Sequence, residues 1–217
     1  GVAVLPLACT SERPASIESE QRRSSSIKSQ SYSAAEACVI CHPQIYGQWN
    51  GSMHSSSWKD PFYPKIYLQL NERTKGASAK FCAVCHSPIG VLSGEIPPAD
   101  GSKVSRVAGQ GVTCDFCHTV SEARGIGNFS AVSSPGGVKF GQIADPVVPS
   151  HAYHKNKFSA LHASGEFCGM CHSVTHPVTK VAIESTYYEW KRGPYAKAGI
   201  TCQDCHMTPG PGVEKPN

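Results

Sequence analysis

The chain has 217 residues, of which 40% are hydrophobic and 8% aromatic, and it carries a formal net charge of +4. Its length suits one or two ordinary domains, but this apolar fraction is low for a large side-chain core. The modest charge gives no support to a nucleic-acid-binding role, and no apolar run of about 18 residues predicts a membrane-spanning helix.

The N-terminal residues 1–33 are predicted to form an exported tail outside the main domain. The stretch Leu7-Ala8-Cys9 follows an apolar run and is similar to the end of an export signal or a bacterial lipobox. Cys9 is therefore interpreted either as a lipid anchor, as a free or intermolecular thiol, or as part of an artificial chain boundary. Residues 10–33 are rich in serine, which predicts a tether.

Helix signals follow in chain order. Residues 33–36 (Ser-Ala-Ala-Glu) predict a capping box that begins a helix. Pro43 predicts the first turn of a second helix, whose apolar spacing continues to Met53. Residues 60–73 predict a further short helix.

The second half of the chain predicts fewer regular elements. Residues 121–150 are rich in Gly, Ser and Pro and predict a surface loop. Thr186 and Glu189 predict a capping box for a helix through Trp190 that ends near Gly193-Pro194. No convincing alternating pattern indicates strands. We therefore expect a mainly α fold with irregular coil and little β structure.

Five copies of Cys-x-x-Cys-His are the most informative pattern in the chain. This motif attaches c-type haem: the two thiols bond to the porphyrin and the histidine reaches its iron. Cysteines at i and i+3 and a histidine at i+4 share one face of a helical turn, so one turn can hold both ring and metal. The sequence predicts five haem c groups, each with its iron, whose large apolar rings replace much of the side-chain core and organise the fold. The first to fifth motifs contain Cys38, Cys41 and His42; Cys82, Cys85 and His86; Cys114, Cys117 and His118; Cys168, Cys171 and His172; and Cys202, Cys205 and His206.

Two other interpretations of the cysteines are weaker. A secreted chain of this kind could carry a disulfide framework, and zinc ribbons also use Cys-x-x-Cys. Neither explains why a histidine follows every pair.

The remaining histidines match the number of iron atoms that need a second axial ligand. Ten histidines minus the five in the motifs leave five, one for each haem. We expect these five to complete bis-histidine coordination, which leaves no open position for substrate. Which histidine serves which iron stays open, as does donation from a neighbouring subunit. The predicted distal ligands are His54, His151, His154, His162 and His176.

An internal duplication organises the predicted haem domain, residues 34–217. The second and fourth motifs share Phe-Cys-x-x-Cys-His-Ser, and the third and fifth share Gly-x-Thr-Cys-x-x-Cys-His. The domain is therefore interpreted as a single-haem segment, residues 34–75, followed by two haem-pair modules at about 76–120 and 151–208.

Sequences beside the motifs resemble a known family. Residues 42–54 (HPQIYGQWNGSMH), 167–177 (FCGMCHSVTHP), 184–190 (ESTYYEW) and 199–207 (GITCQDCHM) are similar to multihaem cytochromes related to the tetrahaem electron acceptor of hydroxylamine oxidoreductase. The resemblance covers about residues 34–208 and implies alternating parallel and perpendicular haem contacts. Some similar cytochromes form extracellular filaments. This chain departs from the tetrahaem pattern by its fifth motif.

Three functional hypotheses follow. The first is an electron carrier without a catalytic site, exported to the cell surface or beyond it, or else periplasmic, and capable of homo-oligomer or filament formation. Its partners would be redox proteins or extracellular acceptors. The second is a reductase of nitrite, hydroxylamine or a similar small nitrogen compound, which needs one open iron. The third is a subunit of a membrane complex, held to the membrane only by a lipid on Cys9.

Overall fold

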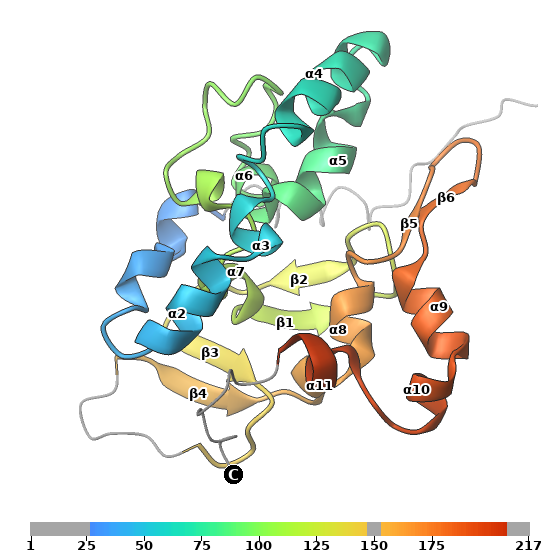
Figure 1. Ribbon diagram of the computed structural model, residues 1–217. Coiled ribbons are helices and arrows are strands. Elements are labelled where there is room, and N and C mark those ends of the chain that lie inside the picture. Colours follow the sequence, from blue (N-terminus) through green and yellow to red (C-terminus); the bar gives the residue numbers. More distant parts are fainter. Residues whose placement is uncertain (1–26, 147–152, 208–217) are drawn as a thin grey trace, which may run out of the picture.

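The computed structural model describes residues 27–146 and 153–207, and shows short helices joined by irregular coil with a few short strands (Figure 1). The predicted tail up to residue 26, with Cys9, and the predicted ligand His151 lie outside the described residues. The α-helices are α2 (Pro43–Asn50), α3 (Met53–Ser56), α4 (Tyr63–Arg73), α5 (Ser78–His86), α6 (Pro88–Leu92), α7 (Cys114–Cys117), α8 (Gly165–Gly169), α9 (Thr186–Arg192), α10 (Pro194–Lys197) and α11 (Cys202–His206). The 3-10 helices are η1 (Ser29–Ser31), η2 (Ala35–Ala37), η3 (Ala108–Gln110) and η4 (Ala160–Ala163).

The strands form three separate two-stranded ladders in the part of the chain that the structure describes. The first and third pairs are antiparallel, whereas the second is parallel. The predicted loop at 121–150 is therefore wrong in part, since it contains most of three of these strands. Each strand is too short to show an alternating pattern, so its pairing depends on tertiary contacts. The strands are β1 (Val120–Ala123) with β2 (Ala131–Ser133), β3 (Val138–Gly141) with β4 (Lys155–Phe158), and β5 (Val174–Thr175) with β6 (Ala182–Glu184).

Several helix boundaries confirm the sequence signals. Pro43 occupies the first turn of α2, and α4 lies within the helix predicted at 60–73. The predicted continuation to Met53 is wrong, because α2 ends at Asn50 and Met53 begins α3 after the N-cap residue Ser52. Helix α9 ends at Arg192 and Gly193 is its C-cap residue. Proline is tolerated in the first turn because the amide hydrogen that it lacks has no partner within the helix.

The two predicted capping boxes are wrong. Residues 35–37 form only a 3-10 turn after an extended Ala34. The carboxylate of Glu36 instead accepts from the Gln110 side chain, at 2.8 Å. Helix α9 follows Ser185 without a side-chain cap. At the first of these positions, a tertiary partner competes successfully for the Glu36 carboxylate.

No helix in the described part of the chain is long and apolar enough to cross a membrane.

The side-chain core of the described residues is small and divided into two clusters. One cluster lies among α6, α7 and the first ladder, and the other lies beneath α4 and α5, which project together at one end of the molecule (Figure 1). The buried members are Tyr32, Ile89, Ala108, Phe116, Val120 and Met170 in the first cluster, and Tyr67, Ala79, Ala83, Ile96 and Ala99 in the second.

Helix α9 packs closely on α8, which contains Cys168, the first cysteine of the fourth motif. A Cβ atom added at Gly165 would lie 2.5 Å from the Trp190 ring, and one at Gly169 would lie 2.5 Å from the Tyr187 ring. The two glycines therefore let aromatic rings approach the backbone of α8. This contact sets the position of the fourth motif against the C-terminal helices.

Candidate haem-attachment sites

The motifs adopt the local geometry that haem attachment requires. In the first, third and fourth motifs the histidine amide donates to the carbonyl of the first cysteine, at 2.9 Å in each case. The second motif lies within α5, and the fifth forms α11. This one-turn conformation brings both thiols and the imidazole to the same side.

The third and fifth motifs are held by the same pair of devices. Thr113 and Thr201 are N-cap residues of α7 and α11, and Thr201 forms a full capping box with Asp204. An indole N–H donates to the backbone just before each cap: Trp49 to the Val112 carbonyl at 2.8 Å, and Trp190 to the Ile200 carbonyl at 2.9 Å. The duplicated sequence therefore has a duplicated support.

Thiols from different motifs contact one another and define which motifs are neighbours. All ten motif cysteines are free thiols in the structure, so they form no disulfide framework. Hydrogen bonds between thiols join the first motif to the third, the second to the fourth, and the fourth to the fifth. The three pairs are Cys38 with Cys114, Cys85 with Cys171, and Cys168 with Cys202.

These contacts make the thiols unequal. Hydrogen bonding to Cys114 lowers the pKa of Cys38 to about 7, and the same contact raises the pKa of Cys114. Burial raises the pKa of Cys117 to about 12. The Cys38 and Cys114 thiols therefore do not ionise independently of each other.

Three motif histidines each lie near a histidine from elsewhere in the chain. Two imidazoles that share one iron have ring centroids roughly 6 Å apart, because each metal–nitrogen bond is about 2 Å long and each bonded nitrogen lies about 1 Å from the centre of its ring. The structure brings three pairs to this separation: His42 and His154 at 6.4 Å, His54 and His172 at 6.1 Å, and His118 and His162 at 6.1 Å.

The β3–β4 ladder positions two of these histidines. Nδ1 of His118 lies 2.7 Å from the Phe140 carbonyl on β3, and the Phe140 amide donates to the His118 carbonyl at 2.8 Å. His154 immediately precedes β4, and its buried Nδ1 has no hydrogen-bond partner among the described residues. A ladder that the sequence pattern did not predict therefore orients the His118 imidazole and begins, on its second strand, directly after His154.

His162 is held at both ring nitrogens. Its Nδ1 lies 2.9 Å from the Ser159 hydroxyl, and its Nε2 lies 3.0 Å from the Cys117 carbonyl, so binding of an iron by His162 requires one of these contacts to break. Its ring is stacked at 17° to that of His118. Gln203 of the fifth motif donates to the His162 carbonyl at 3.0 Å. The 3-10 helix η4, which contains His162, therefore connects the third and fifth motifs.

Burial favours the neutral form of several of these imidazoles. It lowers the pKa of each of them, and neighbouring histidines lower it further at three of the four. Neutral imidazole is the form that binds a metal. The four side chains are His54, His86, His118 and His162.

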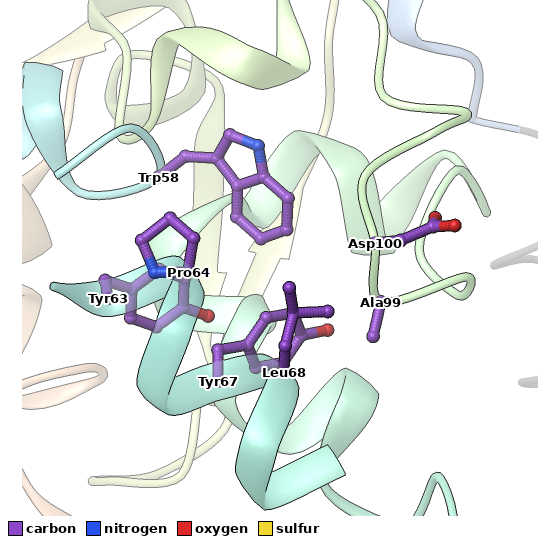
Figure 2. A pocket seen from close by; sticks show the side chains of 7 residues that line it. All are labelled: Trp58, Tyr63, Pro64, Tyr67, Leu68, Ala99 and Asp100. Carbon is purple, nitrogen blue, oxygen red and sulfur yellow. The ribbon is translucent and has the colours of Figure 1, made fainter. Parts of the chain in front are cut away.

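His86 has a different neighbour. Its ring stacks on that of Tyr63 with centroids 3.8 Å apart, and its Nδ1 lies 2.9 Å from the Ser57 carbonyl. Tyr63 also stacks on Tyr67, with centroids 5.3 Å apart. Trp58 completes the group, and Figure 2 shows its indole facing the two tyrosine rings across a small pocket.

The hydroxyl of Tyr63 and the side chain of Tyr67 are both shielded from solvent. The Tyr63 hydroxyl is buried without a hydrogen-bond partner among the described residues, and burial raises the pKa of Tyr63. Burial also raises the pKa of Tyr67 to about 12, and its hydroxyl donates to the Ala79 carbonyl at 2.8 Å. Both tyrosines are therefore neutral at physiological pH.

The other predicted ligands are placed less simply. Nδ1 of His176 accepts from the Val178 and Thr179 amides, at 3.3 and 3.0 Å, in the turn between β5 and β6. A histidine that binds a metal through one ring nitrogen usually donates a hydrogen bond from the other, and the carbonyls beside Nδ1 of His86 and His118 allow this. Nδ1 of His176 instead accepts. His206 is exposed on α11.

A buried ion pair lies between the first and third motifs. Asp115, inside the third motif, pairs with Lys139 on β3, and its second oxygen accepts from the Ser33 amide at 2.6 Å. Its side chain is only 2% exposed. The negative charge of Asp115 acts to raise the pKa of both Cys38 and His118. This effect is larger than the opposite effect of the Lys139 charge.

The residues present therefore fit haem c at these motifs. One turn offers two thiols and an imidazole, and in three cases a second imidazole faces the first at the distance that an iron would span. Sequence reasoning missed Ser57, Tyr63, Asp115 and Phe140, which support the sites. Only Asp115 carried a signal, because it lies inside a motif.

Comparison with known proteins agrees with this geometry. Residues 37–119 match the family described as cytochrome c554 and c-prime. No curated protein matches the chain. A crystal structure of a penta-haem cytochrome c552 from Thermochromatium tepidum is similar, with a TM-score of 0.60 and 23% sequence identity over 82% of this chain. This chain covers 54% of that structure, so it spans about half its length. The chain has the fold of a multihaem c-type cytochrome.

Proposed function

We propose that this protein carries electrons through five covalently attached haem c groups. Haem at these motifs would supply a one-electron ferric–ferrous couple. The observation that carries the proposal is the facing of His42 with His154, His54 with His172, and His118 with His162 at 6.1–6.4 Å. An iron with two imidazole ligands has no open position for substrate, which favours electron transfer over bond chemistry.

The protein's own side chains would bind and orient the cofactor. The thiols of each motif would form the thioether bonds, and the carbonyls of Ser57 and Phe140 would hold the proton of His86 and His118 on Nδ1, which leaves Nε2 for the metal. The small side-chain core is consistent with large apolar groups completing the interior.

The thiol contacts give the order of the sites. The first motif lies against the third, and the fourth lies against both the second and the fifth. Cys117 of the third motif acts electrostatically on Cys168 and Cys171 of the fourth. The order is therefore first, third, fourth, with the second and fifth motifs both beside the fourth.

Haem stoichiometry and electron paramagnetic resonance (EPR) of the oxidised protein test this proposal. We expect five haems per chain by mass spectrometry, falling to four in a variant with Cys202→Ser and Cys205→Ser. Low-spin signals should dominate. Fewer than five haems in the unaltered protein, or predominantly high-spin iron, would contradict the proposed function.

Export and assembly belong to the same proposal. Cys41 and Cys205 are the exposed cysteines among the motifs, so the thiol sides of the first and fifth sites are the accessible ones. Redox proteins, extracellular acceptors or further copies of this chain could exchange electrons there. Electron microscopy of material secreted by the native cells tests filament formation; only cell-associated monomers would count against it.

A reductase of small nitrogen compounds is the second candidate. The observation that favours it is His86, whose ring faces Tyr63 and no second imidazole among the described residues. An iron at the second motif would then keep an open position. A high-spin signal that changes when nitrite or hydroxylamine is added would support this activity, and an unchanged spectrum would oppose it.

A further inference from the structure

One loop touches two of the proposed haem sites. Ser57 follows α3, which carries His54, and it also contacts His86 at the end of α5. His54 faces His172 of the fourth motif, whereas His86 belongs to the second motif. The second and fourth motifs are themselves neighbours through Cys85 and Cys171. The loop therefore lies where two adjacent sites meet.

Ser57 makes three contacts there. Its hydroxyl lies 2.8 Å from the His86 carbonyl and 3.0 Å from the His54 carbonyl, so its single proton is shared between two acceptors. Its own carbonyl lies 2.9 Å from Nδ1 of His86. One residue thus connects the backbone of both histidines and orients one imidazole directly.

Neighbouring backbone closes the junction from the other side. The Val112 amide donates to the His54 carbonyl at 2.9 Å. Gly111 has a φ of +76°, and a Cβ atom there would lie 2.5 Å from both the His54 carbonyl oxygen and the Ser57 hydroxyl. Glycine therefore permits both the backbone conformation and the close approach. Any larger side chain at this position would displace the junction.

We infer that Ser57 is a positioning residue shared by the second and fourth haem sites, setting the orientation of His86 and the placement of His54 together. This inference rests on the proposed ligation by these histidines. A stronger Nδ1–H···O bond makes an imidazole more basic and favours ferric iron. Loosening the loop therefore raises the reduction potential at the second motif and alters the imidazole geometry at the fourth.

The test uses the holoprotein, with covalent haem counted by mass spectrometry and each variant studied by EPR and potentiometric titration. Ser57→Ala should shift the signals of two haems, raise one potential and leave haem content at five. Ser57→Thr, which keeps the hydroxyl, should restore the original values. The matched control is Ser121→Ala, because the half-buried Ser121 hydroxyl also donates to a carbonyl, that of Val132 at 3.3 Å.

A second variant keeps the inference testable if Ser57→Ala does not fold. Gly111→Ala should reproduce its spectral changes, whereas Gly94→Ala should not, since Gly94 has the same φ of +76° with nothing within 4 Å. Unchanged spectra in Ser57→Ala and Gly111→Ala, or equal changes in the controls, would overturn the positioning role. Failure of the unaltered protein to bind five haems would instead overturn the proposed function.

Discussion

The imidazole rings of His54 and His172 lie with their centroids 6.1 Å apart, although one follows the first motif and the other ends the fourth. The planes are tilted by 60°, and the proximity of His172 adds to burial in lowering the pKa of His54. The first haem segment therefore supplies a candidate ligand to the second module.

Replacing His54 should convert one haem from low to high spin. His54→Ala removes the imidazole that faces His172 but leaves every thioether-forming thiol, so five covalent haems should remain. EPR spectroscopy of the oxidised variant measures the change. His176→Ala is the control and should change nothing, because Nδ1 of His176 accepts from backbone amides in a turn. A spectrum of His54→Ala that contains no new high-spin signal would contradict the assignment.

Breaking the buried ion pair should destabilise the protein much more than breaking an exposed one. Asp115→Asn leaves the Lys139 charge, on a side chain only 17% exposed, without its carboxylate, and we expect a loss of about 3 kcal/mol in the free energy of unfolding. Arg106→Ala removes the ion-pair partner of Glu36. This pair is exposed, so the loss in the free energy of unfolding should be under about 1 kcal/mol. Denaturant titration of both holoproteins compares them; equal losses would refute the distinction.

The Glu166 carboxylate should make stability depend on acid. A hydrogen bond from Lys191 is the main reason that the pKa of Glu166 falls from 4.5 to about 2, and Tyr187 donates to it as well. A carboxylate whose pKa is lower in the folded state than in the unfolded state stabilises the fold at pH values above the unfolded-state pKa. That stabilisation is lost as the pH falls from about 4.5 towards 2. The side chain is 37% exposed, so screening leaves about 1 kcal/mol.

Glu166→Gln tests this dependence. The variant should be less stable than the unaltered protein by about 1 kcal/mol at pH 7, and the difference should shrink between pH 4.5 and 2. Thermal unfolding across this range gives the two curves. Parallel curves with a constant separation would show that the carboxylate does not titrate with folding.

Two glycine substitutions should have opposite effects. A Cβ atom at Gly169 would lie 2.5 Å from the Tyr187 ring, so Gly169→Ala should separate α8 from α9 and cost about 1–3 kcal/mol. Gly47 lies within α2 with nothing within 4 Å of the Cβ position, so Gly47→Ala should increase the free energy of unfolding by about 0.5–1 kcal/mol. Chemical denaturation measures both. A stabilised Gly169→Ala would mean that the two helices can separate without loss.

Local sequence determined the elements whose signals lie within a few residues. The five motifs, the proline at the start of α2 and the glycine after α9 act through backbone geometry and short-range hydrogen bonds, which do not need the rest of the chain. The low apolar fraction likewise indicated a small side-chain core. Together these features predicted a mainly helical fold with little β structure.

Tertiary structure alone decided which distant groups meet. Nothing near His118 in sequence indicated that β3 would hold its imidazole through Phe140, or that Glu36 would bind Gln110 instead of capping a helix. The facing of His54 with His172, and the contact of Ser57 with the His86 carbonyl, depend on loop closure between remote segments. Spacing along the chain carries no record of these contacts, because their geometry arises only when the separate segments pack together.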